Sequence, residues 1–75
     1  MIFLIEYDRR KERLVKFQEF QQDQQAQAEQ QRLDIELDLN HRGIEHEVVL
    51  LEAVSEDALR RTHRRYFENL SQLSS

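Results

Sequence analysis

Apolar and polar residues are grouped along the chain in blocks that predict three strands and two helices. The first block, Ile2 to Tyr7, is apolar or aromatic at nearly every position. In an extended strand Ile2 and Leu4 share one face, while Phe3 and Tyr7 lie on the other. A strand with two apolar faces is typical of the interior of a sheet. We therefore expect this segment to be a central strand.

Two further segments have the composition of strands. Residues 8–12 are charged and predict a solvated turn, after which Leu14 to Phe20 resumes an extended pattern with polar residues interleaved. Interleaved polar and charged side chains suit a strand at a sheet edge, where they discourage unwanted pairing. Val48 to Leu51, within residues 44–54, is apolar on both faces and predicts a second central strand.

The segment between the second and third strands gives conflicting signals. Residues 21–31 are mostly Gln, Ala and Glu, which favour a helix, with Asp23 as a candidate N-cap. Leu33 to Leu39 instead alternates apolar and polar residues, as a half-buried strand does. We favour a helix throughout, because the only glycine, Gly43, follows a basic last turn and suits a helix C-terminus. The alternative is a β-hairpin that turns at residues 41–43.

The last helix is expected to begin after Ser55 as its N-cap and to run to about Leu70. Four residues at helical spacing form its apolar stripe, with His63 at the margin: Leu59, Thr62, Tyr66 and Leu70. The chain is thus predicted to be one α+β domain over residues 1–70, of order ββαβα, with a frayed tail at residues 71–75. We expect a three-stranded mixed sheet in which the first and third strands are neighbours, with the helices on one face or one on each.

Length and composition limit how this domain can be stabilised. A domain of 75 residues buries only about 60% of the surface that its unfolded chain exposes. Small domains are commonly stabilised by disulfides, metal or oligomerisation, and the absence of cysteine excludes the first. The apolar start, Met1 to Ile5, is too short for a signal peptide or a membrane span. We expect a cytoplasmic protein without membrane contact.

The formal net charge of −4 is distributed unevenly along the chain. Residues 1–18 carry a balance of +2, residues 19–57 a balance of −9 and residues 58–75 a balance of +3. An acidic middle argues against general polyanion binding by the chain as a whole, but it permits a local basic patch or charge pairing between subunits.

Apolar residues of the predicted first helix form two stripes on opposite sides, because two residues advance a helix by about 200°. One stripe contains Ala26, Leu33 and Leu37, and the other contains Ala28, Ile35 and Leu39. Only one can face the sheet, and we assign Ala28, Ile35 and Leu39 to a contact with a second subunit. The sequence therefore predicts a non-enzymatic interaction module that self-associates as a symmetric dimer, the commonest homo-oligomer.

The densest cationic segment supplies the alternative function. Four arginines with aromatic neighbours could bind nucleic acid or another polyanion: Arg60, Arg61, Arg64 and Arg65. The competing interpretation is a solvated helix face with three i, i+4 ion pairs. These pairs are Glu56 with Arg60, Asp57 with Arg61, and Arg64 with Glu68.

No motif assigns a reaction, metal or cofactor, and we expect none. His46-Glu47 begins like the zinc-protease signature HExxH, but Leu50 stands where the second histidine is needed. A looser ligand set would be His41, Glu45, His46 and Glu47. His63 could act as a general base only with a carboxylate partner. A phosphate-binding loop needs several glycines, and the chain has one.

Overall fold

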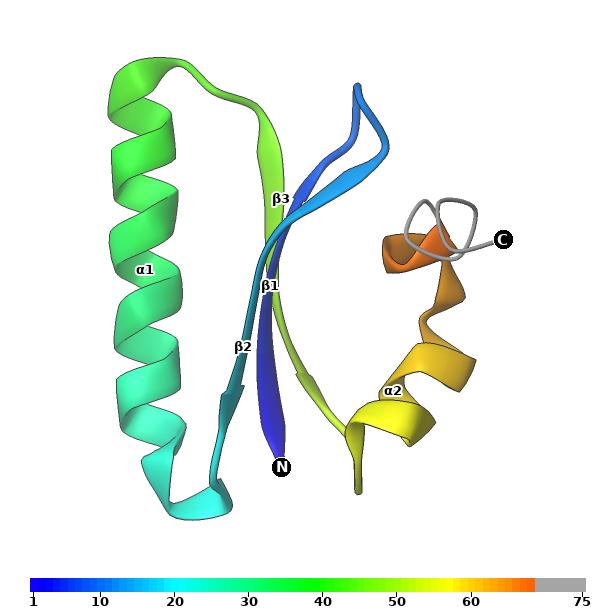
Figure 1. Cartoon of the computed structure of the whole chain (residues 1–75). Helices are drawn as coiled ribbons and strands as arrows, with labels where there is room; N and C mark the ends of the chain where they lie inside the picture. The colour runs from blue at the N-terminus through cyan, green and yellow to red at the C-terminus, as the bar shows by residue number, and fades with distance from the viewer. Residues whose placement is uncertain (69–75) are drawn as a thin grey trace.

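The structure, a computed structural model, describes residues 1–68 and has the predicted order ββαβα. Figure 1 shows the sheet edge-on, with one helix on each side. Short 3₁₀ turns precede the first helix at Gln22–Gln24 (η1) and follow the second at Arg64–Tyr66 (η2). The main elements are β1 (Ile2–Asp8), β2 (Arg13–Phe20), α1 (Gln25–Arg42), β3 (His46–Glu52) and α2 (Glu56–Thr62). Leu70 and the predicted tail at residues 71–75 lie outside the described residues.

The strand order is β2-β1-β3, so β1 and β3 are neighbours and β2 lies at an edge, as predicted. Both neighbouring pairs are antiparallel, and the prediction of a mixed sheet was wrong. The hairpin reverses the chain after β1, and α1 then carries it from the end of β2 to the opposite end of the sheet, where β2 begins. As a result β3 runs parallel to β2, but β1 separates them and is antiparallel to both. β3 is therefore an edge strand and not the second central strand that its composition predicted.

The disputed segment Leu33 to Leu39 is helical, and the hairpin alternative is excluded. The helix ends at Arg42, directly before Gly43, as predicted. Gly43 adopts a left-handed backbone (φ 67°), and its amide donates to the carbonyl of Asn40 at 3.2 Å. The beginning differs from the prediction, because Asp23 lies inside η1 and is not a cap. The side chain of Gln24 instead accepts a hydrogen bond from the Gln21 amide at 2.9 Å.

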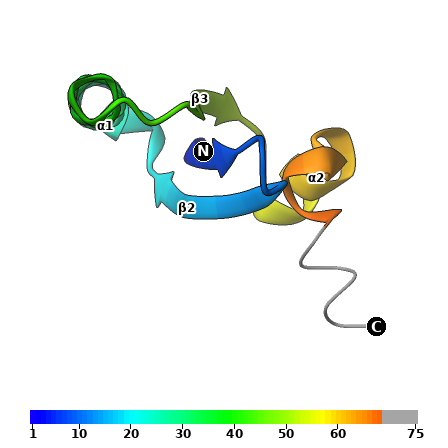
Figure 2. The same cartoon turned by 90° about the horizontal axis from the view of Figure 1, so that it is seen from above.

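The two faces of β1 organise two separate cores, and Figure 2 shows the sheet between α1 and α2. The face beneath α1 is mostly aliphatic, with Ile2, Leu4, Phe20 and Ala28 buried. The face beneath α2 is largely aromatic. Its buried residues are Phe3, Ile5, Tyr7, Leu59, Tyr66 and Phe67. The prediction that β1 is apolar on both faces is confirmed.

The C-terminal segment begins as predicted and then departs from a regular helix. The Ser55 hydroxyl accepts a hydrogen bond from the Ala58 amide at 3.1 Å, as an N-cap should. α2 ends at Thr62, because His63 leaves helical geometry (φ −123°, ψ 54°). Successive residues of a continuous helix point about 100° apart. The break allows Tyr66 and Phe67 to be buried together, 5% and 3% exposed.

Candidate interaction surfaces

The outward face of α1 exposes two leucines one helical turn apart. Leu33 is 45% exposed and Leu37 is 51% exposed. The residues predicted for the subunit contact lie on the other side of the helix. Ala28 and Leu39 are buried, and Ile35 packs against the core beneath α1. The two stripes exist, but the one that faces the sheet is the reverse of our assignment, and Leu33 and Leu37 are left for a partner.

β3 presents a second unpartnered surface, which is the open side of an edge strand. Within residues 1–68, β1 borders one side of β3 and no strand borders the other. The side chains from His46 to Leu51 are half-buried, and four of them are consecutive aliphatic residues. The opposite edge, β2, differs because Lys16, Gln18 and Glu19 interrupt its apolar positions. The two edges of the sheet are therefore chemically distinct.

Two of the four candidate polyanion-binding arginines are engaged within the subunit. Arg60 Nε lies 3.0 Å from Glu56 Oε2, as predicted for this i, i+4 pair, and its guanidinium stacks over the ring of Phe67 at 4.5 Å. Arg65 lies in η2, beyond the end of α2, and its side chain reaches β3, where Nη2 lies 2.7 Å from Glu47 Oε2. These contacts reduce the charge that both arginines offer to a polyanion.

The other two arginines, Arg61 and Arg64, are exposed. Neither makes an ion pair with any of residues 1–68, so the predicted pairs with Asp57 and Glu68 are not formed there. The four arginines thus divide into two engaged and two exposed side chains. The exposed cationic surface is smaller than the sequence indicated.

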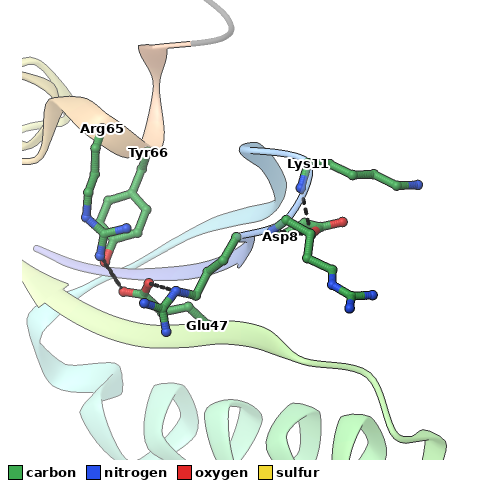
Figure 3. A network of polar contacts seen from close by, with 7 residues as sticks. Asp8, Lys11, Glu47, Arg65 and Tyr66 are labelled. Carbon is green, nitrogen blue, oxygen red and sulfur yellow. Dashed lines mark hydrogen bonds and ion pairs between the residues drawn. The ribbon is translucent and has the colours of Figure 1, made fainter.

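Glu47 is the centre of a polar network that attaches the C-terminal segment to the sheet (Figure 3). Its carboxylate accepts hydrogen bonds from Arg65 and from the Tyr66 hydroxyl. Arg9, in the turn after β1, lies 3.9 Å from the other carboxylate oxygen. The Arg65 guanidinium also covers the Tyr66 ring at 4.2 Å, and that ring meets Tyr7 edge-on at 5.2 Å. The network joins β3, the β1–β2 turn and η2.

The network shifts the protonation equilibria of its members. The hydrogen bond from Arg65 holds the pKa of Glu47 below its ordinary value, and the bond from Tyr66 adds to this effect. Burial, followed by the hydrogen bond to Glu47, raises the pKa of Tyr66 to about 12. At neutral pH the carboxylate is charged and the phenol is neutral. This is the arrangement of a structural attachment, since both groups keep their ordinary protonation states.

The histidines do not form the metal site considered from the sequence. His46 Nδ1 lies 2.7 Å from Glu6 Oε2, and its Nε2 lies 3.6 Å from Asp8, both on the face beneath α1. Glu47 follows His46 in the strand and faces the α2 side, while His41 is exposed near the end of α1. Within residues 1–68, no group of three or more His, Cys, Asp or Glu side chains could hold a metal ion.

A shallow pocket lies where the β1–β2 turn meets the connection from α1 to β3. It is lined by side chains of both charges, among them Asp8, Arg10, Lys11, Glu45 and His46. Asp8 is already engaged there, because its carboxylate accepts from the amides of Arg10 and Lys11 at 3.0 and 3.2 Å (Figure 3). These bonds stabilise the turn and lower the pKa of Asp8. The pocket shows no convergent set of groups for one ligand charge.

The remaining candidate base, His63, is half-buried, with its ring 6.3 Å from that of Tyr66. No acidic side chain among residues 1–68 forms an ion pair with it, so the carboxylate required for a general base is missing there.

No helix within residues 1–68 is long and apolar enough to cross a membrane. Comparison with protein-family models, with curated proteins and with solved structures finds no match to this chain.

Proposed function

We propose that this chain is a small, cytoplasmic, non-enzymatic interaction module that self-associates as a symmetric dimer through the outward face of α1. The observation that carries the proposal is the exposure of Leu33 and Leu37 on a helix whose other apolar stripe already covers the sheet. Leaving an aliphatic side chain in water forgoes about 1.5–3 kcal/mol relative to full burial. Association would recover part of that free energy, and small domains with thin cores are commonly stabilised in this way.

The shape of α1 suits a contact between two copies. The helix spans 18 residues and is the whole outer layer on its side of the sheet, so its outward face meets no other element of residues 1–68 (Figures 1 and 2). Ala26, which is also exposed, extends the leucine stripe by two turns toward the N-terminus. In an antiparallel pair around a two-fold axis, Leu33 of each copy would lie beside Leu37 of the other.

The charges flanking this stripe are partly neutralised within the helix. Arg32 pairs with Glu36 at 3.0 Å, and Arg42 pairs with Asp38 at 3.1 Å. Two of the four carboxylates of α1 therefore have an internal counter-ion, which lessens the repulsion between two acidic helices. Such exposed pairs contribute only a few tenths of a kcal/mol each. We therefore expect a dimer that forms at tens of micromolar and not a permanent one.

Sedimentation equilibrium across a range of concentrations tests the proposal. The wild-type protein should approach the mass of two subunits at tens of micromolar, and its thermal midpoint should rise with concentration, because association stabilises the folded state. Leu33→Glu with Leu37→Glu should give a monomer at the same concentration. The double variant should keep its helical circular dichroism, because both side chains point away from the core.

The matched control is Val54→Glu, which also replaces an exposed apolar residue, 87% exposed, but lies away from α1. This variant should sediment like the wild type. A wild-type mass of one subunit at every concentration, together with a midpoint that dilution does not change, would refute self-association. A dimer that persists in the double leucine variant would refute the α1 contact.

Polyanion binding through Arg60, Arg61, Arg64 and Arg65 remains the weaker alternative. Its support is the exposure of Arg61 and Arg64, and the engagement of Arg60 and Arg65 with carboxylates counts against it. Two exposed cations give few phosphate contacts, and affinity for nucleic acid depends strongly on their number.

A further inference from the structure

We propose that the open edge of β3 binds an extended segment of a partner protein, which adds a fourth strand to the sheet. This surface is separate from the outward face of α1, and the inference does not depend on self-association. Its first basis is backbone hydrogen-bonding capacity. The Ala53 amide donates to the Met1 carbonyl at 3.1 Å, which makes these two residues a hydrogen-bonded pair of the antiparallel ladder.

The register then determines which backbone groups are free. Backbone groups in an antiparallel ladder point alternately to the two sides of a strand. Continued from Ala53, this alternation directs residues 47, 49 and 51 toward β1. The N–H and C=O groups of four residues point to the open side: His46, Val48, Leu50 and Glu52. A strand placed there would find a regular row of donors and acceptors over the whole length of β3.

Side chains on both faces of β3 would contact the added strand. Val48 and Leu50 are half-buried and pack against the core beneath α1. Val49 and Leu51 are also half-buried and pack against the aromatic core on the other face. A neighbouring strand would complete the burial of all four. This supplies the side-chain pockets that accompany backbone pairing in strand addition.

A second copy of this chain does not fit the edge through its own β3. A two-fold axis that pairs β3 with its copy stands perpendicular to the sheet, so both α1 helices would lie on the same face. α1 packs over β3 and β1 and lies beside β3 when the sheet is viewed end-on (Figure 2). Because each α1 lies beside its own β3, the two helices would be only as far apart as the two paired strands, about 4.8 Å. Packed helices need about 8–10 Å. The two helices would overlap, and the edge is left for a segment without a covering helix.

Charge specifies the partner segment further. The helix above the edge carries four carboxylates, at residues 29, 34, 36 and 38, against Arg32 and Arg42. At one end of the edge Glu52 is exposed, and within residues 1–68 its carboxylate accepts a hydrogen bond only from the side-chain amide of Gln22, at 3.4 Å. A complementary segment is therefore extended and apolar or β-branched at its centre, with lysine or arginine at the end that lies beside Glu52.

Amide hydrogen exchange on the whole chain tests this inference residue by residue. The probe is a seven-residue synthetic peptide with lysine at both ends and alternating valine and threonine between them. At ten times its dissociation constant, it should slow exchange of the Val48 and Leu50 amides about tenfold, since only the free fraction exchanges. The amides of residues 47, 49 and 51, already bonded to β1, should change little. A peptide with proline at its centre should give no protection.

A charge reversal tests the predicted preference for a basic residue beside Glu52. Glu52→Lys should weaken binding of the lysine peptide several-fold, while Glu19→Lys, the same change at the exposed edge of β2, should not. Three results would overturn the inference: no protection at Val48 and Leu50, protection in β2 instead, or protection without peptide that increases with protein concentration. The last would mean that a second copy occupies the edge. A monomeric protein that still protects these amides with peptide would contradict the proposed self-association alone.

Discussion

The two faces of one sheet are covered in different ways in this protein. On one side a single regular helix of 18 residues, α1, packs aliphatic side chains against β1 and β3. On the other side a helix of seven residues, α2, stops early, and η2 brings two adjacent aromatic residues, Tyr66 and Phe67, into the core. α1 is held on the sheet by the packing of aliphatic side chains. The α2 side adds an ion pair and aromatic contacts to its packing.

This difference determines which side offers a surface to partners. A long amphipathic helix with a second apolar stripe necessarily turns that stripe to solvent, and α1 exposes Leu33 and Leu37 in this way. The irregular cover uses its aromatic residues internally. Phe17 of β2 stacks on Phe3 at 5.6 Å and meets Phe67 edge-on at 5.6 Å. The α1 side thus turns two leucines of one stripe to solvent, whereas the α2 side keeps its aromatic residues in the core.

The largest effect is expected from substitutions that disrupt the packing of α1 on the sheet. Ile35→Glu with Leu39→Glu would place two carboxylates against the aliphatic core, where Leu39 is 6% exposed. An unpaired buried charge costs several kcal/mol, which is comparable to the whole stability of a small domain. We expect loss of helical circular dichroism and of the cooperative thermal transition. A folded monomer would instead restore our original assignment of this stripe to the subunit contact.

A smaller effect is expected when the polar attachment of the irregular side is removed. Glu47→Gln leaves Arg65 without its counter-ion and should cost about 1.5–3 kcal/mol, the range for hydrogen bonds to charged groups. Because the folded pKa of Glu47 is lowered, its contribution is present above the ordinary pKa of 4.5 and is lost as pH falls through the folded value. Denaturant unfolding of the variant should therefore show a shallower loss of stability below about pH 4.5.

At alkaline pH the contribution of the same network to the free energy of unfolding changes in the opposite direction, and it falls as pH rises. The pKa of Tyr66 is raised from 10.0 to about 12, so its contribution is present below pH 10 and is lost as pH rises toward 12. Tyr66→Phe should flatten the stability curve in that range and leave the acid side steep. Equal acid and alkaline profiles in wild type and both variants would show that the network does not contribute to stability.

The contrast between the two sides also explains what could be predicted from the sequence. The two apolar faces of β1, the helix through Leu33 to Leu39 and its end at Gly43 all follow from local pattern and were predicted correctly. Local pattern does not state which of two equal stripes faces the sheet, and the stripe of Ala28 was assigned to the wrong side. It also predicted a central position for β3, because a strand that packs against a core on both faces can still lie at the edge of a sheet.

The irregular side was harder to predict for a different reason. Helical spacing placed Tyr66 on the core stripe correctly, but it extended the helix to Leu70 through His63. Beyond the end of the helix Tyr66 and Phe67 are both buried, and this packing depends on strands distant in sequence. The pairing of Arg65 with Glu47 across 18 residues has the same origin, and no i, i+4 rule could have found it. The one signal available was that Tyr66 and Phe67 are adjacent.

The smallest expected effect concerns the start of the short helix. Ser55→Ala removes the acceptor of the Ala58 amide and should cost about 1 kcal/mol, lowering the thermal midpoint of a domain this size by about 4–8 °C. α2 has only seven residues, so the loss should spread through it and speed exchange of the Leu59 and His63 amides, which bond to the carbonyls of Ser55 and Leu59. Ser55→Thr keeps the acceptor and should leave both amides protected. Unchanged exchange in the alanine variant would show that Leu59, 0% exposed, holds α2 on the sheet without its cap. In α1 the corresponding amides, two layers away, should not respond to either substitution.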